Sequence, residues 1–455
     1  MSLASGGSTV WRAAVFAAVC LCAGAEAALA QSADRWESAL QQLGSSDFAT
    51  RERGQKELQA ANWRDLAALR SVAEGTRDAE VEARLQAVIA RIEEENALHP
   101  PPISLRVANV DIQGLAEALG KATGLRMTGV AGAPSTGTTS QTTSSAPASS
   151  SAPSSFRYTL DDVDRPFWDV IAEINRQHAV RVSGPTVDGR FELLEGNCEM
   201  HTAANYDAAS GVAAFPLRLT DTRSIGGPGK TERTRYVELS YLLAVDPRMW
   251  VCGMNSSVSI EVRDGAGAAP REGNLLYAYP PPGKAAEYYE MDFHFAPGPF
   301  AVHTLQLLKL PEAGRRISLA TCQAALKVVT RQNVVTVPLA DEEHVAVAAG
   351  DRTIHFSRDG EMFYKVVVER QARGAAEKVA AEADTARKDV DGAAIGVELA
   401  TAEGRIVWSG TWAGYQTRIE LPKDTRWPLT ARVHVPSRVV RLPVSFTFRD
   451  LPLPP

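Results

Sequence analysis

The sequence predicts a multidomain α+β protein that combines N-terminal helical hairpins, a small split βαβ domain and C-terminal antiparallel β-sandwich domains. Three patterns carry this prediction. Apolar residues recur at helical spacing over residues 31–100. Residues 103–184 hold two stretches that each alternate like a strand, change to helical spacing and return to a short strand. Residues 185–455 alternate like strands between Gly, Pro and Asp-Gly turns, which is typical of sandwiches.

The first 30 residues predict where the mature protein works. Arg12 precedes an apolar run over residues 13–23 that is too short to span a bilayer, and Ala-Leu-Ala at 28–30 is a small-x-small cleavage site. Residues 1–30 are therefore predicted to be a signal peptide, and the protein is predicted to be exported to the periplasm or cell surface. Lipidation of Cys22 stays open, although a leucine precedes it where a small residue is preferred. No later segment has about 18 uninterrupted apolar residues, so we expect no transmembrane segment after cleavage.

Four helices are predicted over residues 31–100. Gly44-Ser-Ser-Asp47 ends the first helix and offers a cap for the second. The later helices are expected at residues 48–61, 63–73 and 78–98. The last helix carries one apolar stripe, made of Val81, Leu85, Val88, Ile89 and Ile92. The run from Asp47 to Leu85 resembles a single HEAT-like repeat, which implies packing against a neighbour, since one unit cannot bury its own apolar face.

Two copies of one pattern are predicted at residues 103–130 and 156–184. Apolar positions in the helix and the last strand repeat at an offset of 55 residues, whereas Val-Asp at 110–111 repeats at an offset of 53. This difference predicts a two-residue insertion between the first strand and the helix. The linker at 131–155 is rich in Ser and Thr and has no charged residue, so it is predicted to be disordered.

The doubled pattern resembles the short N-terminal module of secretins and TonB-dependent transducers, known as STN. In that module, small βαβ units dock partner proteins in the periplasm, so the resemblance implies a docking role for residues 103–184. The glycine that usually precedes the last strand is present as Gly124, but His178-Ala179 replaces it in the second copy. The order of the whole chain resembles a class of large exported bacterial proteins with no assigned activity, which implies architecture and location only.

Two β-rich regions are predicted after the βαβ domain, at 185–368 and 392–455, the second as a separate C-terminal β-unit. Strands are expected in the first region at 215–219, 235–244, 257–262, 300–307, 317–320, 325–329, 334–337 and 363–368. Strands are expected in the second region at 395–399, 406–408, 415–421, 431–435 and 444–448. Residues 369–391 are rich in Ala and Glu and predict a poorly buried helix or a mobile excursion.

Composition limits the partners and the redox chemistry. The net charge of −6 is spread along the chain without a basic block, so no nucleic acid partner is expected. Cys198, Cys252 and Cys322 follow the signal peptide at a spacing unlike a zinc site. An oxidising compartment permits a Cys198–Cys252 disulfide, and the alternative is that the cysteines are unpaired, small apolar residues of the core.

The sequence predicts no catalytic, cofactor-binding or metal-ligating residue. Neither a G-x-S-x-G nor an H-E-x-x-H motif occurs. Asp292 and His294 share a strand face but lack further ligands nearby, and Glu342-Glu-His344 is equally isolated. Whether the protein is an enzyme stays open, because carboxylates that only folding brings together leave no sequence pattern.

Exposed aromatic rings are the remaining candidates for a binding site. Tyr277, Tyr279, Tyr288 and Tyr289 lie between predicted strands, and Trp412 lies at a predicted turn. Such rings form platforms for sugars or peptides, or they fill the end of a sandwich core. The preferred hypothesis is a non-catalytic protein of the envelope or periplasm that binds or scaffolds envelope proteins. The alternative is a protein that binds carbohydrate or cell-wall peptidoglycan and has weak hydrolase activity.

Overall fold

A computed structural model gives the fold as two compact units, residues 1–96 and 97–455. The described residues are 36, 38–131, 156–183, 186, 188–195, 205–207, 212–224, 234–254, 259–264, 300–308, 316–339, 344–349, 352–359, 363–370, 389–390, 393–412, 416–423 and 425–452. The predicted signal peptide, Cys22, nearly all of the linker and most of the predicted excursion at 369–391 lie outside them.

The first unit is helical, as predicted. Residues 38–43 are helical, and they are followed by α2 (Phe48–Leu58), the short 3-10 helix η1 (Trp63–Asp65), α3 (Leu66–Gly75) and α4 (Ala79–Leu98), whose last turn enters the second unit. Asp47 caps α2, because its carboxylate accepts a hydrogen bond from Thr50 N at 2.8 Å. The predicted stripe on α4 is confirmed, since all five of its side chains are buried in the core of this unit.

The second unit begins with the two predicted copies of the strand-helix-strand pattern. These copies and the strand β5 that follows them are called the βαβ unit below. The first copy is β1 (Ile103–Val110), α5 (Ile112–Thr123) and β2 (Met127–Val130). The second copy is β3 (Tyr158–Arg165), α6 (Phe167–Gln177) and β4 (Val180–Ser183), and β5 (Phe191–Glu195) follows. The element order of both copies is confirmed.

The predicted position of the two-residue insertion is wrong. The first strands and the helices both begin 55 residues apart, whereas the last strands begin 53 residues apart. Asn109 and Asp164, also 55 residues apart, both adopt the left-handed conformation, with φ of 54° and 52°. The repeated Val-Asp pair is therefore a coincidence of sequence, and the length difference lies between the helix and the last strand.

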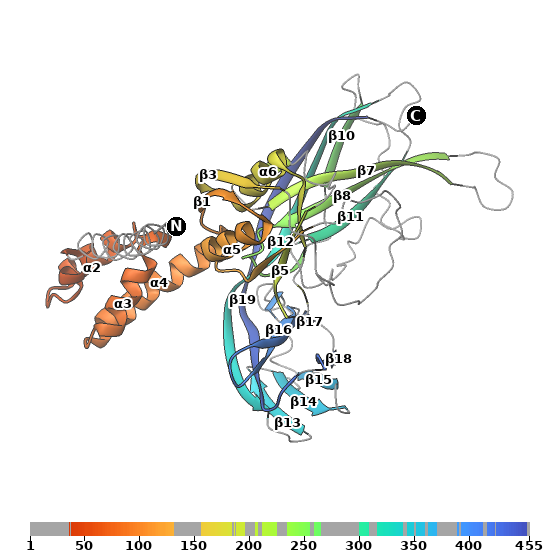
Figure 1. Ribbon diagram of the computed structural model, residues 1–455. Coiled ribbons are helices and arrows are strands. Elements are labelled where there is room, and N and C mark those ends of the chain that lie inside the picture. Colours follow the sequence, from red (N-terminus) through yellow and green to blue (C-terminus); the bar gives the residue numbers. More distant parts are fainter. Residues whose placement is uncertain are drawn as a thin grey trace, which may run out of the picture. The chain divides into compact units, whose positions relative to one another are not determined.

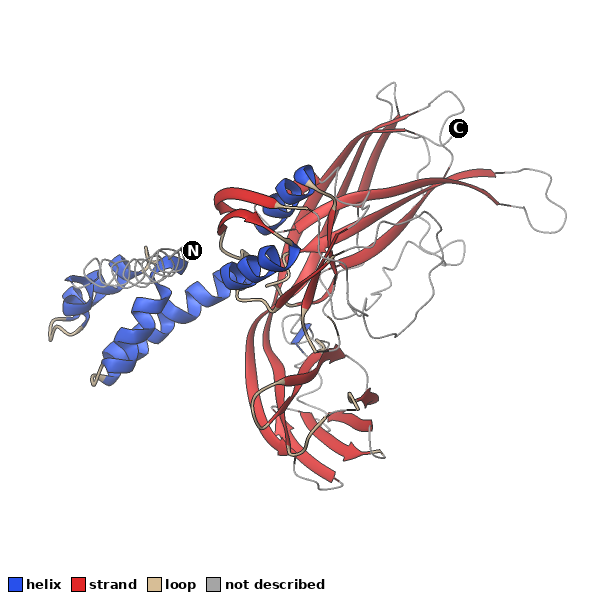
Figure 2. Cartoon of the chain, viewed as in Figure 1, coloured by secondary structure: helices blue, strands red, loops and turns tan. Residues whose placement is uncertain are grey.

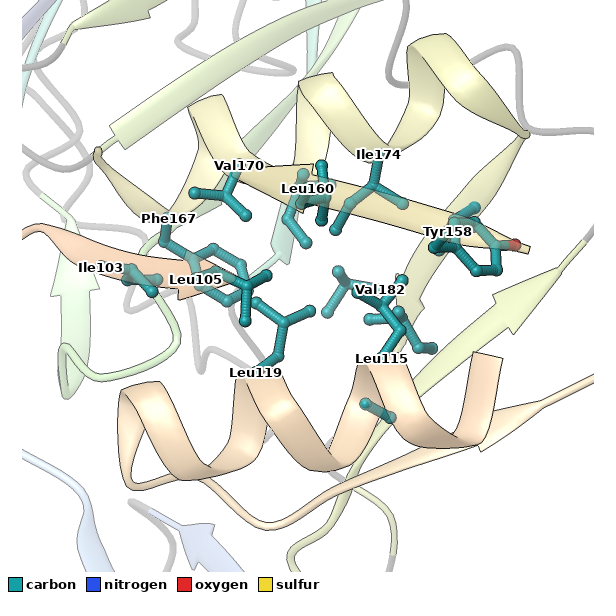
Figure 3. Packing of buried hydrophobic residues seen from close by; sticks show 14 of the residues in the cluster. Ile103, Leu105, Leu115, Leu119, Tyr158, Leu160, Phe167, Val170, Ile174 and Val182 are labelled. Carbon is teal, nitrogen blue, oxygen red and sulfur yellow. The ribbon is translucent and has the colours of Figure 1, made fainter. Parts of the chain in front are cut away.

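Two sheets and two helices enclose the core of the βαβ unit. β1 pairs with β3 in an antiparallel two-stranded sheet, while β5 pairs with β2 in parallel and with β4 antiparallel. Figure 3 shows Leu115 and Leu119 of α5 pointing toward Val170 and Ile174 of α6. Ala244, near the end of β8, belongs to the same cluster, so the following β-region contributes to this core.

The described residues in the rest of the second unit are almost entirely strand (Figures 1 and 2). Its strands are β6 (Asn205–Asp207), β7 (Val212–Ser224), β8 (Thr234–Val245), β9 (Val251–Met254), β10 (Ser259–Asp264), β11 (Phe300–Leu308), β12 (Arg316–Leu339), β13 (His344–Ala349), β14 (Arg352–Arg358), β15 (Phe363–Arg370), β16 (Ile395–Thr401), β17 (Ile406–Trp412), β18 (Gln416–Glu420) and β19 (Leu429–Pro452). Three sheets result, with orders β11-β8-β7-β6, β13-β14-β15-β18 and β10-β12-β19-β16-β17, and β9 also pairs with β12. The chain is thus a mixed helix-and-strand protein with several small sheets.

One long ribbon organises this region. β12 and β19 are each 24 residues long and pair antiparallel from one end to the other. Each was predicted as two or three shorter strands, and that prediction is wrong. The pairing contains an irregularity between Val329 and Gln332, and Pro436 lies opposite it. A bulge shifts the apolar alternation and a proline suggests a strand end, so the sequence pattern breaks where the strand continues.

Strands from the two predicted β-regions share sheets. β16, β17 and β19 join the sheet of β12, and β18 joins β13, β14 and β15. Residues from both of these sheets form one buried cluster, which includes Val337, Phe356, Val366, Leu399 and Val433. The sheets therefore pack on each other, and residues 392–455 complete them rather than forming sheets of their own.

Candidate functional site

The two-stranded sheet β1–β3 is the candidate site, and its two faces differ sharply. One face is built from Ile103, Leu105, Tyr158 and Leu160, which are at most 4% exposed. Strand alternation places the intervening residues on the other face. These residues are all exposed: Ser104, Arg106, Ala108, Thr159, Asp161 and Val163. Figure 1 shows β1 and β3 side by side near α6.

An ion pair and a hydrogen bond on the outer face join the two strands. Arg106 Nε lies 3.0 Å from Asp161 Oδ1, and the two side chains are 74% and 80% exposed. Ser104 Oγ lies 3.3 Å from Asp164 Oδ1. Val163 adds an exposed apolar side chain, at 48% exposure. The face therefore presents charge, hydroxyl groups and one apolar group to solvent.

A polar pair lies at the buried end of β3. Tyr158, which is fully buried, donates a hydrogen bond from its hydroxyl to Glu195 Oε1 at 3.1 Å. Burial, together with the charge and hydrogen bond of Glu195, raises the pKa of the Tyr158 hydroxyl above its ordinary value. His178 packs edge-on against Tyr158 and stacks on the half-exposed ring of Phe156, with ring centroids 5.4 and 4.5 Å apart. This arrangement fixes the start of β3 against the end of α6.

Side-chain amides from the helices cover strand edges of the βαβ unit. Gln177 binds the backbone of Thr159 twice, accepting from its N–H at 3.3 Å and donating to its carbonyl at 2.7 Å. Gln113 accepts a hydrogen bond from Gly129 N in β2 at 3.0 Å. Within the described residues, β1 pairs with β3 alone and no side chain binds its backbone on the other side, which we call the open edge of β1.

A second polar cluster lies in the middle of the long ribbon. The carboxylate of Asp389 is 4% exposed and accepts two hydrogen bonds from Arg441 of β19, at 2.5 and 3.0 Å. Lys327 Nζ of β12 lies 3.2 Å from it. Burial by itself raises the pKa of Asp389, but the hydrogen bonds and charges of Arg441 and Lys327 outweigh burial and hold that pKa below its usual value.

The same cluster fixes the start of β16. Arg352 of β14, 4% exposed, donates to the carbonyls of Val390 and Ala393 at 3.0 and 3.1 Å. These contacts join three strands to the segment that precedes β16. Because every group is engaged with the protein itself, the cluster acts as a structural clamp.

Cys252 lies beside this clamp as a free thiol. It is half-buried on β9 and its Sγ lies 3.4 Å from the carbonyl of Lys327. Burial, the main cause, raises the pKa of the Cys252 thiol to about 12. Cys198 lies outside the described residues and the side chain of Cys322 is not described, so the pairing of the cysteines stays a prediction.

Of the predicted aromatic candidates, only the backbone of Trp412 lies within the described residues. Tyr277, Tyr279, Tyr288 and Tyr289 lie outside the described residues. Trp412 is not at a turn as predicted, because it is the last residue of β17 and pairs with Ile395; its side chain is not described. Trp408 of the same strand packs against the shared core of the sheets.

The candidate metal ligands lie only in part within the described residues. Asp292 and His294 lie outside the described residues, and His344 begins β13 beside His355, with ring centroids 5.3 Å apart. Among the side chains that the structure describes, no group of three His, Cys, Asp or Glu residues is arranged to hold a metal ion. None of the described helices is both long and apolar enough to cross a membrane.

Sequence reasoning missed the residues that define these clusters. Gln113 and Gln177 are ordinary polar residues on helix surfaces, and only the path of the neighbouring strand gives them a role. Asp389 lies in a segment rich in Ala and charged residues, and its sequence pattern does not distinguish it from the other charged residues there. The comparisons with known proteins give no match, since no family model fits the chain and neither a curated protein nor a solved structure is significantly similar to it.

Proposed function

We propose that this is an exported, non-catalytic protein of the cell envelope or periplasm that binds another protein through its β1–β3 sheet. The observation that carries the proposal is the exposure of this sheet. All six outward side chains are exposed, and β1 has an open edge among the described residues. Sheets of this kind offer both a face and a row of backbone groups to a partner.

The arrangement of the βαβ unit supports the proposed resemblance to the STN module. Two strand-helix-strand copies contribute their helices to one core that they share with a two-stranded and a three-stranded sheet. We propose further that the sheets that share the core around Phe356 and Leu399 form a β-sandwich, and that residues 31–100 are a HEAT-like unit. A signal peptide at residues 1–30 and export to the periplasm or cell surface belong to the same proposal.

Site-specific photo-cross-linking in the native envelope tests the function. A photoreactive amino acid is placed at Ala108 or Val163, on the outer face of the β1–β3 sheet. The matched control is Val334 of β12, which is 50% exposed and lies outside the βαβ unit. We expect a discrete protein adduct from Ala108 and Val163 and none from Val334. Equal adducts from all three positions, or no protein adduct from the first two, would contradict the proposal.

The carbohydrate-binding alternative makes a different prediction for the same experiment. It requires the aromatic residues Tyr277, Tyr279, Tyr288, Tyr289 and Trp412, and no described contact favours it. Cross-links to cell-wall glycan without a protein adduct would support this alternative and call for an assay of hydrolase activity.

A further inference from the structure

We propose that the open edge of β1 accepts an extended peptide segment of the partner, which adds to the sheet as a strand beside β1. This inference rests on the proposed function and specifies how the same surface binds. Backbone N–H and C=O groups at a strand edge are satisfied best by another extended backbone, so the edge itself defines the chemistry of the ligand.

The first argument is that β1 differs from the edge strands β3 and β2 of the unit. At β3, the Gln177 amide occupies both backbone groups of Thr159, as a neighbouring strand would. At β2, the Gln113 side chain accepts a hydrogen bond from the N–H of Gly129 and so occupies a backbone group of that edge. The described residues provide no such cover for β1.

The second argument is that the backbone of Arg106 faces the open edge. Opposed residues in an antiparallel pair alternate between hydrogen-bonded pairs and pairs whose backbone groups point away from each other. Gln177 binds the N–H and C=O of Thr159, so these groups point away from β1. The backbone N–H and C=O of Asp161, two residues later in β3, also point away from β1. Asp161 lies opposite Arg106 in the pairing. The N–H and C=O of Arg106 therefore point outward from the free side of β1.

The third argument concerns the length and charge of the added strand. The β1–β3 pairing is regular from Leu105 to Val107 and irregular on both sides, so the edge fits a short segment centred on Arg106. The Arg106 side chain is 74% exposed and its Nε is the atom paired with Asp161. A residue across from Arg106 on an added strand lies within reach of the guanidinium, so an acidic residue is favoured there.

Peptide selection against the full-length mature protein provides the test. A phage-displayed library of random octapeptides is the probe, and enriched peptides are synthesised for affinity measurement. Arg106→Pro removes the outward N–H but leaves the β1–β3 hydrogen bonds in place, since proline is tolerated where a strand N–H faces solvent. We expect this variant to bind the peptides at least tenfold more weakly than the wild type.

Two controls separate the backbone from the side chain and one edge from the other. Arg106→Ala keeps the N–H and loses only an exposed charge, so its affinity should fall no more than about fivefold. Asp161→Pro alters the outward N–H of β3 instead and also removes the carboxylate paired with Arg106, so this variant should bind the peptides at least as tightly as the wild type. Enriched peptides are expected to carry an Asp or Glu.

Several outcomes would overturn strand addition. These are the absence of enriched peptides, binding by Arg106→Pro within threefold of the wild type, or an equal loss in Arg106→Pro and Arg106→Ala. If Arg106→Pro fails to fold, amide exchange of residues 104–108 in the wild type decides, because strand addition must slow it when peptide is bound. If Ala108 and Val163 give protein cross-links but no peptide is enriched, the proposed binding of a partner protein stands and only strand addition at β1 is rejected.

Discussion

The βαβ unit and the middle of the β12–β19 ribbon both hold together segments that are far apart in the sequence, but they bury different chemistry. The βαβ unit buries mainly apolar side chains from both copies, pairs its buried Glu195 with the neutral Tyr158 hydroxyl, and leaves the Arg106–Asp161 ion pair in solvent. The ribbon instead buries the carboxylate of Asp389 between two cations, Lys327 and Arg441. Both ion pairs join a carboxylate to an arginine. The Arg106–Asp161 pair is hydrated, whereas the Asp389 carboxylate is shielded from water, so the two pairs should contribute differently to stability.

Replacing the buried carboxylate should have the largest effect. Asp389→Ala leaves Lys327 and Arg441 at the ribbon without this counter-charge, so we expect the free energy of unfolding to fall by about 3–5 kcal/mol. The matched control is Asp161→Ala, which breaks an exposed pair and should cost less than about 1 kcal/mol. Urea denaturation of both variants measures the difference. Similar losses in the two variants would show that burial does not determine how much each ion pair contributes to the free energy of unfolding.

The pH dependence of stability sharpens the same contrast. The pKa of Asp389 is lowered in the folded state, so the carboxylate stabilises the fold above its unfolded pKa of about 4. This contribution is lost as the pH falls from about 4 through the folded pKa. The wild type should therefore lose its advantage over Asp389→Asn in that range and keep it between pH 5 and 7. Urea denaturation at a series of pH values measures this, and a constant difference between the two proteins across the range would contradict it.

The parts of the fold that depend on local periodicity could be predicted from the sequence. The stripe on α4 and the strand-helix-strand order of both copies follow from the spacing of apolar residues, since each element buries one face. The long strands β12 and β19 could not be predicted, because an irregularity and a proline interrupt their alternation while the hydrogen-bonded pairing continues.

The candidate site was predictable only in part. The βαβ unit was expected to dock a partner from its resemblance to STN, but the surface within it depends on which strands pair. β1 pairs with β3 across the linker rather than with β2, and this long-range pairing leaves no mark in either strand. The cover that Gln177 gives to Thr159 has the same origin, because the two residues meet only once α6 has packed beside β3.

An intermediate effect is expected from the buried polar pair of the βαβ unit. Tyr158→Phe keeps the ring among its apolar neighbours and removes the hydrogen bond to Glu195, which is 8% exposed. We expect a loss of about 1–3 kcal/mol in the free energy of unfolding, because a buried carboxylate loses a donor. Ser104→Ala removes an exposed hydroxyl of the same unit and should cost no more than about 0.5 kcal/mol. Thermal and urea denaturation compare the two, and equal losses would mean that the Tyr158 hydroxyl is already solvated.

The smallest change in stability, but a clear change in association, is expected from the amide that covers β3. Gln177→Ala frees the backbone groups of Thr159 to solvent and should lower the free energy of unfolding by no more than about 1.5 kcal/mol. It also gives the β1–β3 sheet a second open edge, so concentration-dependent self-association should rise in light scattering.

Gln113→Ala is the matched control, because α5 itself still lies against β2 at Gly129 after the amide is gone. We expect this variant to remain as monodisperse as the wild type. If it associates as strongly as Gln177→Ala, the loss of a helix-surface amide alone causes association, and the distinction between covered and open edges fails. If only Gln177→Ala associates, and adding Asp161→Pro to that variant suppresses the association, then the contacts between molecules form along the outward backbone groups of β3.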